Sequence, residues 1–72
     1  MDLVLEAGNR LVGIEVKASS TITAEDFKGL RALAAEAKQR FVRGVVLYTG
    51  MQVLPFGERL VAMPVSSLWR LG

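Results

Sequence analysis

Residues 10–19, RLVGIEVKAS, decide the fold of this chain. Apolar and other side chains alternate over residues 11–18, and a period of two is typical of a β-strand, in which successive side chains point to opposite faces. The apolar set, which we expect to face the core, consists of Val12, Ile14, Val16 and Ala18. The opposite face carries Glu15 and Lys17, so the predicted strand presents an acid and a base side by side.

A tight turn precedes this strand. Residues 2–6 alternate in the same way and are followed closely by Gly8-Asn9, two residue types that adopt positive φ at little cost. We therefore predict a hairpin that joins residues 2–6 to the strand through a two-residue loop. The register that this loop sets places Leu3 opposite Ile14, so that the apolar side chains of both strands share one face.

Two carboxylates face each other in that register, Asp2 on the first strand and Glu15 on the second. Directly opposed like charges destabilise a strand pair, and a divalent cation between them would reverse the sign of their interaction. Magnesium or manganese fits, because both prefer oxygen ligands, and the carbonyl oxygen of Val16 could be a third ligand. A metal-bound water could then act as a nucleophile, with Lys17 positioning it or neutralising a phosphate. The alternative is an ordinary Glu-x-Lys pair on a solvated strand face.

A helix follows the strand. Thr23 is a favourable N-cap, and Asp26 lies three residues further on, which is a weak form of the capping box. The next apolar side chains are spaced three and four apart and predict one buried stripe on a helix over residues 24–38. The members of this stripe are Ala24, Phe27, Leu30, Leu33, Ala34 and Ala37.

The second half of the chain contains three further strand signals. Residues 42–48 end in a continuous apolar run, which is typical of a strand buried on both faces in a parallel sheet. Short strands are predicted near residues 53–54 and 59–63, and Pro64 opens a last turn or short helix. We therefore predict one α/β domain over residues 1–72, with a mixed sheet of about five strands and one main helix. Its parts are a β-hairpin, a βαβ crossover and short C-terminal strands.

Composition limits the possible functions. The chain contains neither cysteine nor histidine, which excludes disulfides, thiolate chemistry, histidine zinc sites and serine–histidine catalysis. The net charge of +2 is weak evidence for binding to nucleic acid. Lys28 and Arg31 are candidate contacts for nucleic-acid phosphates, and a solvated helix face is the alternative. Since no apolar run is long enough to span a bilayer and no signal peptide is evident, we expect no membrane contact and a cytoplasmic location.

Several segments, taken in their order along the chain, resemble segments of a known family. They are residues 2–6, residues 13–19, the helix, residues 44–50 and residues 53–57. Together they resemble the C-terminal domain of unknown function of bacterial and archaeal AAA+-like ATPases, a member of the PD-(D/E)XK nuclease-like superfamily. The resemblance implies a restriction-endonuclease-like core and a nuclease-like activity on phosphodiester bonds. It also implies that Asp2 and Glu15 bind the metal and that Lys17 assists the attacking water.

The chain departs from the superfamily at its N-terminal side. Superfamily nucleases usually carry another acidic residue on an upstream helix and a strand after it, and both are missing here. The resemblance therefore implies a domain truncated at its N-terminus, with an ATPase domain in the full-length parent and DNA as a possible partner. A missing strand would expose a sheet edge, so we expect homo-oligomers. The alternatives are a non-catalytic DNA-binding or protein-interaction module and an orphan oligomeric α/β protein.

Overall fold

A five-stranded sheet in the order β1-β2-β3-β5-β4 is the framework of the fold. The computed structural model describes residues 3–70, with the backbone alone at residues 69 and 70. The strands are β1 (Leu3–Ala7), β2 (Arg10–Val16), β3 (Phe41–Tyr48), β4 (Leu54–Pro55) and β5 (Leu60–Pro64). The helical segments are η1 (Ala24–Phe27), α1 (Lys28–Ala37), η2 (Lys38–Arg40) and η3 (Val65–Arg70). Between residues 3 and 70 no helix combines the length and the apolar character that crossing a membrane requires.

The predicted hairpin is confirmed, including its register. β1 and β2 are antiparallel, Leu3 lies opposite Ile14, and Ala7 lies opposite Arg10 across the two loop residues. Gly8 has a φ of 62°, the left-handed conformation that glycine adopts without steric cost. Asp2 lies outside the described residues, so its position opposite Glu15 stays a prediction.

The mixed sheet and its single main helix also agree with the prediction. β2, β3 and β5 are parallel neighbours, whereas β1 and β4 run antiparallel to theirs at the two edges. β3 is the central strand, which explains why its sequence is apolar on both faces. The helix predicted over residues 24–38 is a 3₁₀ turn, an α-helix and a second 3₁₀ turn in succession, η1, α1 and η2.

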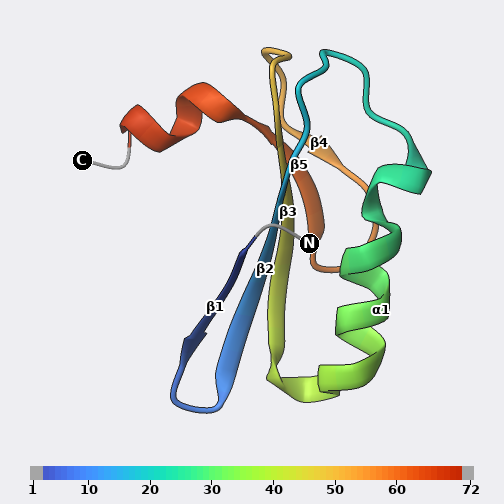
Figure 1. Ribbon diagram of the computed structural model, residues 1–72, viewed down its shortest axis with the longest axis vertical. Coiled ribbons are helices and arrows are strands. Elements are labelled where there is room, and N and C mark those ends of the chain that lie inside the picture. Colours follow the sequence, from blue (N-terminus) through green and yellow to red (C-terminus); the bar gives the residue numbers. More distant parts are fainter. Residues whose placement is uncertain (1–2, 71–72) are drawn as a thin grey trace.

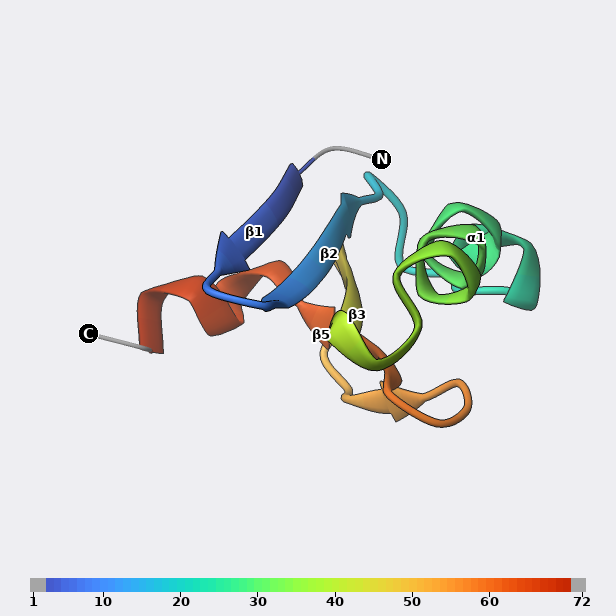
Figure 2. The same cartoon turned by 90° about the horizontal axis from the view of Figure 1, so that it is seen from below.

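The helix covers the face of the sheet opposite to the one predicted. α1 lies on one side of the sheet and η3 on the other (Figures 1 and 2). Leu11 of β2 belongs to the core cluster with Phe27 and Leu30, whereas Val16, expected to face the core, is 57% exposed. The set that we predicted to face the core is therefore on the helix-free face. The helix packs against the face that holds Leu11, Gly13 and Glu15.

Two glycines explain this choice of face. Gly13 of β2 lies beside Gly44 of β3 in the parallel register. A Cβ atom on Gly44 would come within 3.2 Å of the Leu30 Cβ atom of α1. The sheet therefore has a shallow strip without side chains on this face, and the helix approaches the backbone there. Residues that close this core are Phe41, Val46, Tyr48, Leu60 and Ala62.

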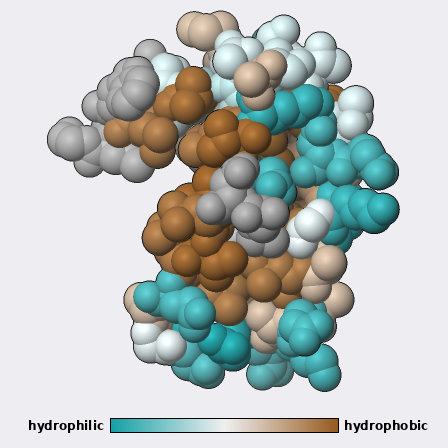
Figure 3. Space-filling view, viewed as in Figure 1, coloured by the Kyte–Doolittle hydropathy of each residue, from teal (hydrophilic) through white to brown (hydrophobic). Residues whose placement is uncertain are grey.

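The helix-free face is only partly covered. An apolar hollow on it lies under η3, and its walls are Ile14, Val45, Leu47, Met63, Ser67 and Leu68. Beyond η3 the surface over β1 and β2 stays apolar and open to solvent, as Figure 3 shows in the view of Figure 1. Leu3, Leu5 and Val16 all have high exposed fractions there.

Candidate functional site

Glu15 lies at the C-terminal end of β2, on the face that the helix covers. Its neighbour on β3 is Val46, which is fully buried. A Cβ atom on Gly29, in the first turn of α1, would lie 3.5 Å from the Oε2 atom of Glu15. The carboxylate is therefore half-buried between the end of a rigid strand and the start of the helix.

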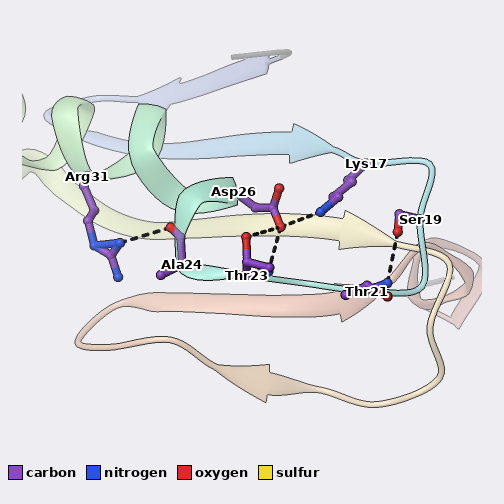
Figure 4. A network of polar contacts seen from close by, with 7 residues as sticks. All are labelled: Lys17, Ser19, Thr21, Thr23, Ala24, Asp26 and Arg31. Carbon is purple, nitrogen blue, oxygen red and sulfur yellow. Dashed lines mark hydrogen bonds and ion pairs between the residues drawn. The ribbon is translucent and has the colours of Figure 1, made fainter.

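Lys17 follows on the same face and is held by Asp26 of η1. Its Nζ atom donates to the Oδ2 atom of Asp26 at 2.6 Å (Figure 4). The Lys17 backbone N–H also donates to the carbonyl oxygen of Leu47 at 2.8 Å, which extends the parallel ladder by one residue. Both ends of this lysine are therefore fixed.

Asp26 has a second role as the acid of a capping box. Its Oδ2 atom accepts the backbone N–H of Thr23 at 2.7 Å, and its own N–H donates to the Thr23 carbonyl oxygen at 3.1 Å. The predicted box is thus confirmed. The ion pair with Lys17 was not predicted. It joins residues of two different elements, and the local spacing that identified Asp26 as a capping residue carries no signal for it.

The charged network shifts the ionisation of Asp26. The hydrogen bond from the Lys17 ammonium lowers the pKa of the Asp26 carboxyl below its ordinary value of 3.8, and the bond from the Thr23 backbone lowers it further. Burial acts in the opposite direction and is the weaker influence on this pKa. The ionised form of Asp26 is therefore favoured by folding.

This pKa shift predicts a pH dependence of stability. A carboxyl whose pKa is lowered by folding contributes stability above its unfolded pKa, and the contribution disappears as pH falls from ~5 through the lowered pKa. Asp26→Asn should therefore lower the free energy of unfolding at pH 7 and reduce its loss on acidification, measured by urea unfolding between neutral and acid pH. Glu25→Gln, at the exposed neighbouring acid, is the matched control and should keep the parent profile. A parent-like profile in Asp26→Asn would contradict the assignment.

The predicted metal ligands are not all within the described residues. Glu15 and Val16 are adjacent at the end of β2, and the side chain of Val16 points to the helix-free face. Asp2 lies outside the described part of the chain. Within residues 3–70 no three acidic, histidine or cysteine side chains come together as a metal-binding group.

Lys28 and Arg31, the predicted nucleic-acid contacts, differ in their surroundings. Arg31 donates from its guanidinium to the carbonyl oxygens of Ala24, at 3.4 Å, and Phe56, at 3.3 Å. It therefore ties the start of the helix to the loop after β4 (Figure 4 shows its bond to Ala24). Lys28 is exposed at the first position of α1. A structural role for Arg31 is shown, and contact with phosphate stays a prediction for both residues.

Comparison with models of protein families identifies one family. Comparison with curated proteins and with solved structures gives no match. The model of one protein family, described as a domain of unknown function (DUF4143), matches residues 1–68. That match includes the hairpin, the crossover helix, all five strands and most of η3. The chain therefore belongs to the DUF4143 family.

Proposed function

We propose that this chain is the core of a metal-dependent phosphodiesterase of the PD-(D/E)XK nuclease type, with a restriction-endonuclease-like fold and DNA as substrate. The observation that carries the proposal is the placement of Glu15 and Lys17 on one face of β2, where the strand ends beside the start of α1. The hairpin register supports Asp2 as the second acid. A strand end and a helix start are rigid elements and suit such a site, because the metal ion and the lysine ammonium must be held in fixed positions relative to one phosphate.

Magnesium or manganese would be held by Asp2, Glu15 and the carbonyl oxygen of Val16. This set fits the ion, since magnesium usually takes one or two carboxylates and keeps several waters. The half-buried position of Glu15 beside Gly29 of the helix also fits, because a partly exposed carboxylate remains accessible to an ion and its waters. When bound, the ion would supply a water of lowered pKa and a positive charge for the phosphate.

Lys17 would assist the attacking water or neutralise charge on the phosphate. Its ion pair with Asp26 supports this role, since it fixes the end of a flexible side chain that lies two residues after Glu15 in the chain. An ammonium group that is already held in place can stabilise negative charge on the phosphate without a further loss of side-chain entropy. Asp26 would then be a positioning residue, because it acts through Lys17.

We also propose that this chain is part of a longer protein. An ATPase domain in a longer parent is part of the same proposal and rests on the family resemblance of the segments described above. A cytoplasmic location is proposed with it. A non-catalytic DNA-binding or interaction module is the alternative. It needs the exposed basic residues of the helix, such as Lys28, and no metal.

A calorimetric titration with manganese tests the metal site. We expect the parent chain to bind one ion, and Asp2→Ala and Glu15→Ala each to weaken binding by about tenfold or more, because even the loss of groups that support a ligand costs 10–100-fold. Glu36→Ala is the matched control: it removes an exposed acid at the far end of α1 and should bind like the parent. Parent-like binding by Glu15→Ala, or no binding by the parent, would contradict the proposal and favour the non-catalytic module.

A further inference from the structure

The loop between β3 and β4 (residues 49–53) borders the candidate site. The Thr49 backbone N–H donates to the carbonyl oxygen of Ser19, which follows β2, at 3.0 Å. The Lys17 backbone N–H continues the hydrogen-bond ladder with β3, so that Lys17 and Tyr48 take neighbouring positions where the two strands end. The loops that follow β2 and β3 lie together at this end of the sheet (Figures 1 and 4). A ligand held at Lys17 would therefore lie beside the β3–β4 loop.

Tyr48 holds the β3–β4 loop in place. Its side chain is buried, and its hydroxyl group donates to the carbonyl oxygen of Gln52 at 2.6 Å. Gly50 lies against the Tyr48 ring: a Cβ atom there would come within 2.6 Å of the Tyr48 Cζ atom, closer than non-bonded carbon atoms approach. Together with the bond from Thr49 to Ser19, these contacts fix the loop at three points. A loop that is already ordered meets a ligand with little further loss of conformational entropy.

Met51 lies between the fixed points and extends into solvent. It is 81% exposed, the highest fraction among the large apolar residues of the described part of the chain. The exposed residues Thr49 and Gln52 add a hydroxyl group and an amide on either side, and the loop contains no charged residue. An apolar side chain between two uncharged hydrogen-bonding groups suits a nucleobase, which has apolar faces and polar edges. The loop is therefore suited to contact bases, whereas Lys17 is suited to contact a phosphate.

We propose that Met51 inserts between neighbouring bases of the DNA whose phosphate is held at Glu15 and Lys17. This inference rests on the proposed function. Methionine is one of the apolar residues that proteins insert between base steps, which unstacks the bases and kinks the duplex. Met51 follows Tyr48 by three residues, a reach of at most ~11 Å, or about three base steps of ~3.4 Å. The inserted side chain and the held phosphate would therefore belong to the same short stretch of DNA.

Insertion selects DNA that unstacks easily. Removing a base from the stack costs least where the base is mismatched or already unpaired. The chain should therefore bind a duplex with a single mismatch more tightly than the same duplex with every base paired. The substrate class of the candidate site is then duplex DNA with a weakened base step.

The fluorescence of 2-aminopurine tests the insertion, because this base analogue brightens when it leaves the stack. With manganese present, we expect the parent chain to brighten a 2-aminopurine placed beside a single mismatch. Fluorescence anisotropy should show tighter binding of this duplex than of the paired one. Electrophoresis of the same samples shows whether the strands stay intact, so that brightening is not confused with cleavage.

Met51→Ala should bind the mismatched duplex about fivefold or more weakly, the lower end of the range for a side chain that stacks on a base. It should leave the 2-aminopurine dark, although it should fold like the parent because Met51 is exposed. Met51→Leu should retain the brightening, since it keeps a large apolar side chain. Val42→Ala is the matched control: it shortens an exposed apolar residue at the other end of β3 and should behave like the parent.

Failure of this inference differs from failure of the proposed function. If the parent binds DNA and Met51→Ala matches it in affinity and brightening, or if Val42→Ala loses as much as Met51→Ala, the inference is overturned and the proposed function is untouched. If the parent binds neither duplex, both are overturned, and a protein becomes the expected partner of the β3–β4 loop.

Discussion

Phe27→Ala is expected to cost about 3–5 kcal/mol, the range for removing a fully buried phenylalanine. Phe27 is fully buried where η1 meets α1, and its ring stacks on Phe56 with centroids 4.7 Å apart. One helix and one face of the sheet supply this core, so few neighbours can move in to fill the cavity. A chain of 72 residues has a total stability of roughly 4–11 kcal/mol at ~0.05–0.15 kcal/mol per residue. The substitution should therefore remove a large share of the total stability.

Urea unfolding followed by circular dichroism measures this loss. Met51→Ala is the control, because Met51 is a large apolar residue that is 81% exposed. Its free energy of unfolding should stay within about 0.5 kcal/mol of the parent. Equal unfolding midpoints for Phe27→Ala and Met51→Ala would show that the helix does not depend on this contact.

Gly44→Ala is expected to destabilise the fold by about 1–3 kcal/mol, the usual cost of overpacking. The new Cβ atom would lie 2.9 Å from Leu60 Cδ2, 2.9 Å from Phe41 Cζ and 3.2 Å from Leu30 Cβ. The Leu60 and Phe41 side chains are buried and have little room to move. The Leu30 Cβ atom can retreat only if the whole helix moves away from the sheet, which would open the core.

Gly29→Ala is the matched control and should raise the stability of the fold, whereas Gly44→Ala should lower it. The same methyl group would be added at an exposed position in the first turn of α1, where its nearest atom is Glu15 Oε2 at an ordinary contact distance of 3.5 Å. Alanine in a helix is more stable than glycine by roughly 0.5–1 kcal/mol. Thermal unfolding of the two variants side by side measures both effects. A Gly44→Ala variant as stable as Gly29→Ala would contradict the packing described for the glycine strip.

The candidate site could be predicted in part. The alternation along β2 placed Glu15 and Lys17 on one face, and the structure agrees. The ion pair between Lys17 and Asp26 could not be predicted from that pattern, because it joins residues whose proximity depends on the path of the loop between β2 and η1. Asp26 was recognised as a capping residue from local spacing alone, and local spacing carries no information on a partner in another element.

The sequence by itself determined the elements and their pairing along the chain. Gly8-Asn9 fixed the hairpin and its register, and the three- and four-residue spacing of apolar side chains located the helix, because both signals act between residues that are close in sequence. Only the tertiary structure decided which face of the sheet the helix covers. The alternation along β2 predicted the face of Val12, Ile14 and Val16, and this was wrong, because the pattern does not show where a helix can approach the backbone. The helix packs where the paired Gly13 and Gly44 leave room for Leu30, and that space exists only when the two strands lie side by side.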